Sequence, residues 1–214
     1  MEKVIVICGP TASGKTALSI DLAKHINGEI VSADSMQIYK YMDIGTAKPT
    51  KEEMQGIKHY MIDIIYPNQR YSVANYQKDA IKAIDEIIAK GKRPIVVGGT
   101  GLYIDSLIYG IEYQDIKFDE QYREYLEKRV QAEGLEKLYQ EANQIDSQAM
   151  LKISHNDKKR ILRVLEIYHA TGKNKTQQEI ESRKNAPKYD YKVYELVWNR
   201  EVLYERINKR VDLM

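Results

Sequence analysis

The stretch Gly9-Pro10-Thr11-Ala12-Ser13-Gly14-Lys15-Thr16 fits the pattern G-x-x-x-x-G-K-S/T of a phosphate-binding P-loop. It follows a short apolar and β-branched run, residues 4–8, which has the composition of a buried parallel strand. After the loop, Leu18, Leu22 and Ile26 recur every four residues, which predicts a helix with an apolar stripe. Strand, glycine-bearing loop and helix therefore occur in the order that a phosphate site at the edge of a parallel sheet requires.

This loop predicts an anion site. Its backbone amides and the positive end of the following helix point at the ligand. Lys15 adds a full charge for the outer phosphate, and Thr16 offers a hydroxyl to a Mg²⁺ that bridges the phosphates. The motif alone leaves open whether the phosphates belong to ATP and whether a phosphate is transferred.

Composition sets the broad class of protein. The 214 residues, of which 43% are hydrophobic, suffice for one large domain or for a core with a small insertion. With a net charge of +2, any surface that attracts nucleic acid must be local. The single cysteine, Cys8, excludes an intramolecular disulfide and reads as a small buried hydrophobe. Since no signal peptide or membrane-spanning run is visible, we expect a soluble cytoplasmic protein.

Residues 3–109 alternate between strand and helix patterns. Apolar runs occupy 29–33, 59–65 and 94–97, and 102–109 has a helical pattern. Between them, Ser72 caps and Gly91 ends a helix whose apolar face includes Tyr76, Ala80, Ile84 and Ile87. This alternation predicts an α/β fold of the P-loop NTPase type, with a parallel sheet flanked by helices on both faces.

The pattern changes at about residue 115, where strand signals disappear. Charged amphipathic helices are predicted at 118–133, 135–143, 157–171 and 175–184, followed by a strand at 193–198 and a helix at 201–214. We therefore expect an α/β core of residues 1–113 and 190–214, and an all-helical insertion of residues 114–189. Because the sequence ends inside a helical pattern, we also expect it to be part of a longer protein.

Asp34 is the first candidate for chemistry outside the P-loop. It follows an apolar strand, so it should project at the carboxyl end of the sheet, where ligands of open α/β sheets bind. It could ligate Mg²⁺ or act as a general base, or it could cap a turn. Asp63 also follows an apolar stretch and is a second candidate acid, but a structural role is favoured for it and for His59.

Two loops and two basic helix faces complete the candidates. Residues 45–49 form a loop in which Thr46 and Lys48 could face an anion, and residues 98–101 form a turn that could admit a ligand or simply be tight. The remaining candidates are pairs of cations four residues apart, which share a helix face: Lys159 with Arg163, and Arg206 with Arg210. Lys159 and Arg163 could contact a phosphate backbone, or they could simply face solvent. Either Arg206 or Arg210 could reach a phosphate.

Taken together these segments resemble the tRNA dimethylallyltransferases, also called tRNA isopentenyltransferases. The resemblance rests on residues 9–16, on Asp34-Ser35-Met36-Gln37-Ile38-Tyr39, and on residues 42–49, 59–63, 97–103, 156–163 and 200–212. The Asp-Ser-x-Gln block and the block Asp-Ile-Gly-Thr-Ala-Lys-Pro at 43–49 are far more specific than the P-loop alone.

The resemblance implies transfer of a dimethylallyl group from dimethylallyl diphosphate to N6 of adenosine 37 of tRNA. Diphosphate is then the leaving group, and Gly9, Pro10, Thr11, Ala12, Ser13, Gly14, Lys15 and Thr16 bind it, with Mg²⁺ at Thr16. By the same resemblance Asp34 is the general base, and Thr11 and Arg210 are further catalytic contacts. Arg210 is preferred to Arg206 because the family pattern places its arginine at the second position.

The resemblance also implies an interface for the tRNA anticodon stem-loop. The implied tRNA-binding residues are Asp34, Ser35, Met36, Gln37, Thr100, Arg123, Lys159, Arg160, Ile161, Leu162 and Arg163. We expect a monomer without zinc, and family members usually continue for about another third of their length.

Three other functions remain open at this stage. An isopentenyltransferase acting on free adenine nucleotides would share the P-loop and the base, although it would not need a large helical insertion. A small-molecule P-loop kinase would share the core, but the sequence shows no arginine-rich lid. A non-catalytic nucleotide-sensing or RNA-binding module would not need Asp34 for turnover.

Overall fold

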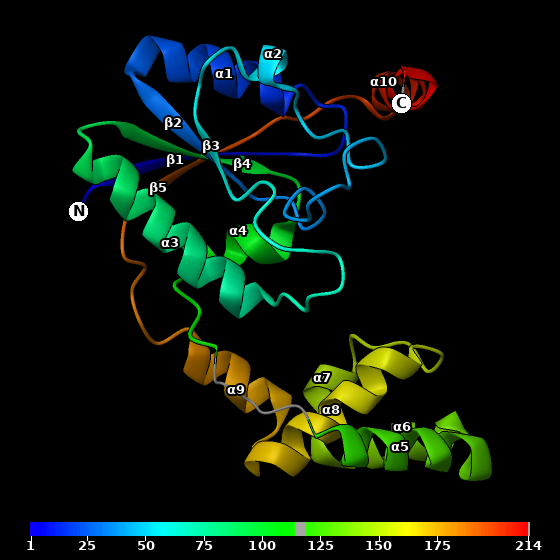
Figure 1. Cartoon of the computed structure of the whole chain (residues 1–214). Coiled ribbons are helices and arrows are strands. Elements are labelled where there is room, and N and C mark those ends of the chain that lie inside the picture. The colour runs from blue at the N-terminus through cyan, green and yellow to red at the C-terminus, as the bar shows by residue number, and fades with distance from the viewer. Residues whose placement is uncertain (114–118, 214) are drawn as a thin grey trace. The chain divides into compact units, whose positions relative to one another are not determined.

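The computed structural model describes residues 1–113 and 119–213 (Figure 1). It divides the chain into two compact units, which are Met1–Ile111 with Ala186–Met214, and Glu112–Asn185. We call them the sheet unit and the helical unit. The predicted boundary at residue 114 and the predicted helix start at Phe118 lie outside the described residues.

The sheet unit is built on five parallel strands. They are β1 (Lys3–Cys8), β2 (Gly28–Ser32), β3 (His59–Tyr60), β4 (Arg93–Gly98) and β5 (Asp190–Glu195). Their order is β3-β2-β4-β1-β5, so each link between consecutive strands crosses over the sheet. The predicted parallel sheet is confirmed.

Helices cover both faces of this sheet. They are α1 (Lys15–Ile26), α3 (Val73–Ala89) and α4 (Gly101–Ile108), and the unit also contains α2 (Lys51–Met54) and α10 (Arg200–Leu213). In Figure 1, α1 lies on one side of the strands and α3 and α4 on the other. Because side chains alternate along a strand, Val6 and Val96 pack with α3 and α4, while Ile7 and Ile95 pack with α1. The sheet thus separates two apolar layers.

The α3 prediction is confirmed in detail. The Ser72 hydroxyl accepts a hydrogen bond from the Asn75 amide, and the Asn75 side chain accepts from the Ser72 amide, which makes a capping box. The predicted apolar face of α3 is fully buried.

Two other predictions need correction. In α1 the buried face is formed by Ser19, Ile20 and Ala23, whereas Leu18 is 44% exposed. The predicted stripe therefore runs along the margin of the face that meets the sheet. β5 starts and ends three residues before the predicted strand, since its register with β1 runs from Lys3 opposite Asp190 to Cys8 opposite Glu195.

The helical unit has a core of its own. Its helices are α5 (Glu120–Glu133), α6 (Leu135–Ile145), α7 (Ser147–Met150), α8 (Lys158–Thr171) and α9 (Lys175–Ser182). The core is made of apolar side chains from α5 to α8, with Leu126, Leu138 and Leu162 fully buried. Asp157 caps α8 by accepting a hydrogen bond from the Arg160 amide at 3.1 Å.

Residues 186–189, which we assigned to the insertion, group with the sheet unit instead. Tyr189 is 4% exposed in the sheet-unit core, and its hydroxyl donates to Asp85 on α3. Among the described residues, no helix has the length and apolar character needed to span a bilayer.

Candidate active site

Three loops meet at the carboxyl ends of β1, β2 and β4. The Thr100 amide, after β4, donates to the Ala33 carbonyl at 3.1 Å, and the Ser35 amide, after β2, donates to the Thr100 hydroxyl at 3.0 Å. A Cβ on Gly98 would lie 2.1 Å from the Ala33 carbonyl oxygen, so only glycine allows this approach. A Cβ on Gly99 would lie 3.4 Å from the carbonyl oxygen of the P-loop residue Gly9. The turn at 98–101 therefore serves as the junction between the loops.

The P-loop carries its lysine folded over its own backbone. Lys15 Nζ donates to the carbonyls of Gly9 at 2.9 Å and Pro10 at 2.6 Å. Burial lowers the pKa of Lys15, the nearby positive charge of Arg210 lowers it further, and the carboxylate of Asp34 opposes this shift. Arg210 and Asp34 thus lie near enough to Lys15 to influence its charge, which brings together three residues that sequence analysis singled out separately.

The hydroxyls of the P-loop divide into an exposed set and a buried one. Thr11 and Thr16 are exposed, and neither hydroxyl makes a hydrogen bond within the described part of the chain. Ser13 is 3% exposed, and its buried hydroxyl oxygen has no hydrogen-bond partner among the described residues. An orphaned buried hydroxyl is costly and is typical of a site that a ligand or water completes.

Asp34 has one of its predicted roles, that of a turn cap. Its Oδ1 accepts hydrogen bonds from the amides of Met36 at 2.8 Å and Gln37 at 3.3 Å, so the carboxylate does cap the turn after β2. Its Oδ2 accepts no hydrogen bond from the residues that the structure describes. The cap fixes the orientation of the carboxylate and leaves its second oxygen without a partner among the described residues.

Gln37 and Lys48 organise the loop beside Asp34. Gln37 accepts from the Ser32 hydroxyl at 3.3 Å and donates to the Thr46 carbonyl at 3.3 Å. Lys48, whose side chain is 6% exposed, reaches one carboxylate oxygen each of Asp43 and Asp63 at 2.6 Å. Lys48 is therefore a tie within the loop and does not face a ligand, and Asp63 has the structural role expected of it.

Two side chains of the C-terminal segment contact the P-loop backbone, which the sequence did not predict. Trp198 Nε1 donates to the Ser13 carbonyl at 2.9 Å, and Arg206 Nε donates to the Ala12 carbonyl at 2.7 Å. The one feature of the sequence that could have pointed to these contacts is Trp198, the single tryptophan, which lies just after β5.

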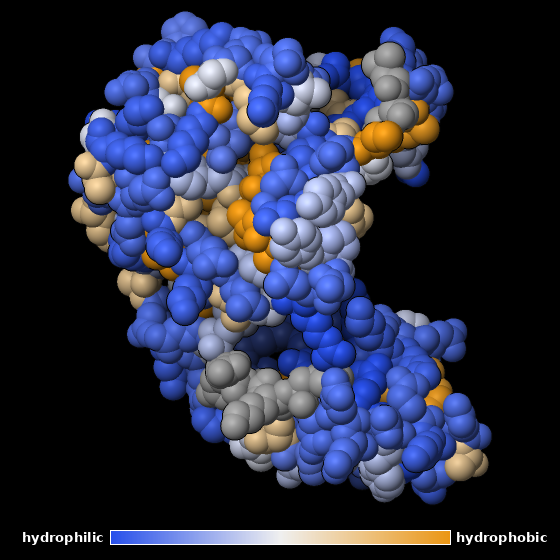
Figure 2. All heavy atoms as spheres, viewed as in Figure 1, coloured by the Kyte–Doolittle hydropathy of each residue, from blue (hydrophilic) through white to orange (hydrophobic). Residues whose placement is uncertain are grey.

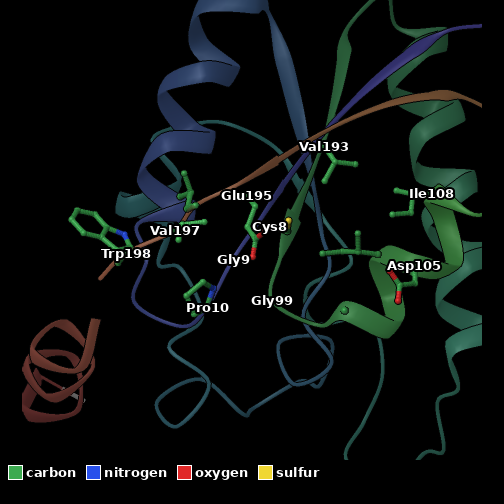
Figure 3. A pocket seen from close by; sticks show the side chains of 13 residues that line it. Cys8, Gly9, Pro10, Gly99, Asp105, Ile108, Val193, Glu195, Val197 and Trp198 are labelled. Atoms are coloured by element: carbon green, nitrogen blue, oxygen red, sulfur yellow. The ribbon is translucent and has the colours of Figure 1, made fainter. Parts of the chain in front are cut away.

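A cleft of about 650 Å³ opens beside the P-loop, on the side of β5. Figure 3 shows Cys8 and Glu195 at its centre, with Trp198 on one side and Asp105 and Ile108 on the other. Burial and the neighbouring Glu195 raise the pKa of Cys8, which keeps it a thiol. Gly9, Pro10, Gly99 and Gly101 also line this cleft, so it reaches the junction of the three loops. Lys15 and Asp34 are not among the described residues that line it.

The predicted tRNA contacts in the helical unit fall into two groups. Lys159, Arg160 and Arg163 are exposed on α8. Ile161 and Leu162, also predicted to bind tRNA, are fully buried in the core, so their side chains are not available to a nucleic acid.

Arg123 is bound within the helical unit. It donates to Glu127 at 3.1 Å and to Glu166 at 2.8 Å. Figure 2 shows the visible face of this unit as mostly hydrophilic.

The fold and the site define a protein of the P-loop α/β class, with its P-loop at the carboxyl edge of a parallel sheet. The sequence profile of the IPP transferase family matches residues 37–214. The chain belongs to this family of prenyltransferases, which act on diphosphate substrates.

Individual relatives agree with this assignment. The tRNA dimethylallyltransferase of Acetivibrio thermocellus is 54% identical over 214 residues, which cover 100% of this chain and 68% of the relative. That of Caldanaerobacter subterraneus subsp. tengcongensis is 50% identical and is covered to the same 68%. The chain thus spans about two thirds of the length of these relatives.

Solved structures show the same fold. The full-length tRNA isopentenylpyrophosphate transferase of Bacillus halodurans aligns with a TM-score of 0.66 at 44% identity, covering 100% of this chain and 66% of that one. A eukaryotic dimethylallyltransferase, solved in snapshots of its action on tRNA, aligns with a TM-score of 0.79 at 33% identity over 99% of this chain and 52% of its own. The predicted P-loop-like α/β fold and the predicted family are confirmed.

Proposed function

We propose that this protein transfers the dimethylallyl group of dimethylallyl diphosphate to N6 of adenosine 37 in the tRNA anticodon stem-loop and releases diphosphate. The observation that carries the proposal is the junction of the three loops. There Asp34, held by one carboxylate oxygen with the other unused, lies within electrostatic reach of the P-loop lysine. A phosphate cradle beside an oriented base suits a transfer in which a diphosphate leaves and a proton must be removed.

The P-loop serves the leaving group. The allylic C–O bond of the donor breaks, and both electrons of that bond stay on the diphosphate oxygen. Lys15, Thr11 and the loop amides, with Arg210 from α10, stabilise the negative charge as it grows. Lys15 donates to backbone carbonyls and lies near the positive charge of Arg210. A bound diphosphate gives both cations an anionic partner, which is stronger.

Asp34 serves the acceptor. The N6 lone pair of adenosine forms the new C–N bond, and the N6 proton passes to the unused Oδ2 of Asp34. The adenosine must leave its stack to reach the site, which costs less in a loop than in a duplex. The residues around Asp34, in the turn and where it meets the loop after β4, are proposed to contact the flipped base: Ser35, Met36, Gln37 and Thr100.

Magnesium fits the residues at the P-loop. The hydroxyl of Thr16 is exposed and unpaired within the described chain, which is the donor chemistry that Mg²⁺ accepts. Among the described residues, no group of three or more His, Cys, Asp or Glu side chains could hold a metal by itself. That suits an ion that keeps waters and binds mainly through substrate phosphates. When bound, Mg²⁺ supplies positive charge that offsets the charge of the diphosphate.

The basic face of α8 serves the nucleic acid. Lys159, Arg160 and Arg163 are exposed cations on one helix, and such side chains suit contacts to the phosphate backbone. Arg123 is a weaker candidate for the same ligand, because all three of its guanidinium nitrogens already contact Glu127 or Glu166. The monomeric state expected from the sequence belongs to the proposal as well.

Replacing Asp34 by Asn tests the proposal. Asparagine is as good a cap as aspartate, so the turn after β2 should persist while the base is removed. We expect Asp34→Asn to lower the rate of transfer to tRNA by about 10²-fold or more, with tRNA affinity unchanged. The rate is measured with radiolabelled dimethylallyl diphosphate.

Asp63→Asn is the matched control, because Asp63 is also an acid near a strand end but pairs with Lys48. Turnover by Asp34→Asn at the normal rate would remove Asp34 from the mechanism. Offering AMP in place of tRNA tests the acceptor, and label found in AMP alone would refute the tRNA assignment.

A further inference from the structure

Arg206 is attached to the P-loop and is also stacked on an aromatic ring. Its Nε donates to the Ala12 carbonyl at 2.7 Å, and its guanidinium carbon lies 4.5 Å from the centroid of the Trp198 ring. Trp198 in turn donates its Nε1 to the Ser13 carbonyl at 2.9 Å. Two consecutive carbonyls of the P-loop, those of Ala12 and Ser13, therefore accept hydrogen bonds from two side chains that also contact each other. We call Trp198 and Arg206 the clamp.

The clamp acts on the most strained part of the loop. Ala12 has φ 64°, a left-handed conformation that a residue with a Cβ rarely adopts. Such a conformation persists only where surrounding contacts fix it. The hydrogen bond from Arg206 to the Ala12 carbonyl is one such contact, and the bond from Trp198 to the next carbonyl is another.

The clamp leaves the phosphate-binding end of Arg206 unused. Within the described residues, its two terminal nitrogens have no hydrogen-bond acceptor and no carboxylate partner. One of them would lie 3.6 Å from a Cβ built on Gly14, the residue that opens α1. Free N–H groups of a fixed guanidinium beside the amides of a P-loop are suited to bind phosphate oxygens.

We infer that Arg206 is a second guanidinium of the diphosphate site, besides Arg210, and that Trp198 is its positioning residue. This inference rests on the proposed function. Ring stacking and the Nε bond fix the plane of the guanidinium before the ligand arrives, so its terminal N–H groups bind without losing side-chain freedom. Lysine cannot replace it, because an ammonium neither stacks in this plane nor donates from three fixed nitrogens.

The test is binding of inorganic diphosphate with Mg²⁺, measured by calorimetry on the 214-residue chain. We expect Arg206→Lys to weaken binding at least about 10-fold, the scale of one charge-assisted hydrogen bond. Trp198→Ala should weaken it comparably, and Trp198→Phe, which keeps a ring and removes the N–H donor, should fall between. The double variant Arg206→Lys/Trp198→Ala should lose less affinity than the two single losses combined, because Trp198 orients the guanidinium of Arg206, and fully additive losses would contradict this coupling.

Arg200→Lys is the matched control. Arg200 also lies over an aromatic ring on α10, at 5.3 Å from the centroid of Tyr204, but within the described residues it makes no bond to the P-loop. Its variant should bind diphosphate as the unchanged chain does. Thermal unfolding of every variant identifies any loss of folding, and Trp198→Phe keeps the test open if Trp198→Ala does not fold.

Two results would overturn the inference in different ways. If Arg206→Lys binds diphosphate as tightly as Arg200→Lys, while Lys15→Ala does not bind, the site exists and Arg206 has no part in it. If the unchanged chain and Lys15→Ala are equally without diphosphate affinity, the proposed function itself fails and the inference fails with it.

Discussion

Lys15 carries the charge on which the P-loop depends, in surroundings that oppose that charge. Burial lowers its pKa, and Arg210 lowers it further. A bound diphosphate favours the protonated lysine, so affinity is fully present below the pKa of Lys15 and is lost as the pH rises through it. Because that pKa is lowered, the loss should begin at a lower pH than for an ordinary lysine, whose pKa is about 10.4.

Arg210→Ala provides the residue-scale prediction. Removing the neighbouring positive charge should raise the pKa of Lys15, so the alkaline loss of diphosphate affinity should move to higher pH. Affinity at neutral pH should fall at the same time, since the diphosphate then has one cationic partner fewer. Diphosphate titrations across the alkaline range measure both effects. If diphosphate affinity is lost at the same alkaline pH with and without Arg210, then Arg210 does not act on Lys15.

At the scale of an element, α8 has two faces with different tasks. Ile161 and Leu162 are buried at its centre, while Lys159 and Arg163 lie four residues apart at the surface. Asp157 fixes the start of the helix, and packing of the apolar side chains in the core fixes which side chains point outward. The basic face is therefore a consequence of how the apolar face packs.

The element-scale prediction concerns the salt dependence of tRNA affinity. For each phosphate that the protein no longer neutralises, the slope of log K against log salt should flatten by about 0.7–0.9. Lys159→Ala/Arg163→Ala should therefore flatten it by roughly twice that amount. Lys137→Ala is the control, because Lys137 is 63% exposed in the same unit and pairs with Glu133. If both variants show the same slope of log K against log salt, the α8 cations face solvent and do not contact tRNA phosphates.

At the scale of the molecule, the chain has separate cores in its two units. The sheet unit packs apolar side chains on both faces of β1, β2 and β4, and the helical unit packs its own around α8. Of the residues that the structure describes, none belongs to the cores of both units. Each unit can therefore open by itself, as local stability follows contiguous packing.

Leu162→Ala tests this independence. Leu162 is fully buried in the helical unit, so its truncation should cost about 2–5 kcal/mol of the stability of that unit. Native-state hydrogen exchange should then show faster exchange in α5, α6 and α8 and unchanged protection in β1 and β4. Leu151→Ala is the control, because Leu151 is 87% exposed in the same unit. Equal loss of protection in the two units would mean that they unfold as one.

The sequence by itself determined the order of the elements, the P-loop and the family. These depend on local patterns: the alternation of apolar residues in strands, the cap at Ser72, and a loop whose glycines and Lys15 are close together in the chain. It also placed Asp34 at the right edge of the sheet, because parallel strands end at a common edge.

Only the tertiary structure decided which of these residues meet and what each one faces. Lys48 has the composition of an anion ligand, yet it is buried between two carboxylates. Ile161 and Leu162 adjoin basic residues in the chain, and the turn of the helix puts them in the core. Trp198 and Arg206 reach the P-loop across separations of 185 and 194 residues, and no local pattern encodes such contacts. Side-chain direction and long-range contact depend on packing, which the order of residues along the chain does not display.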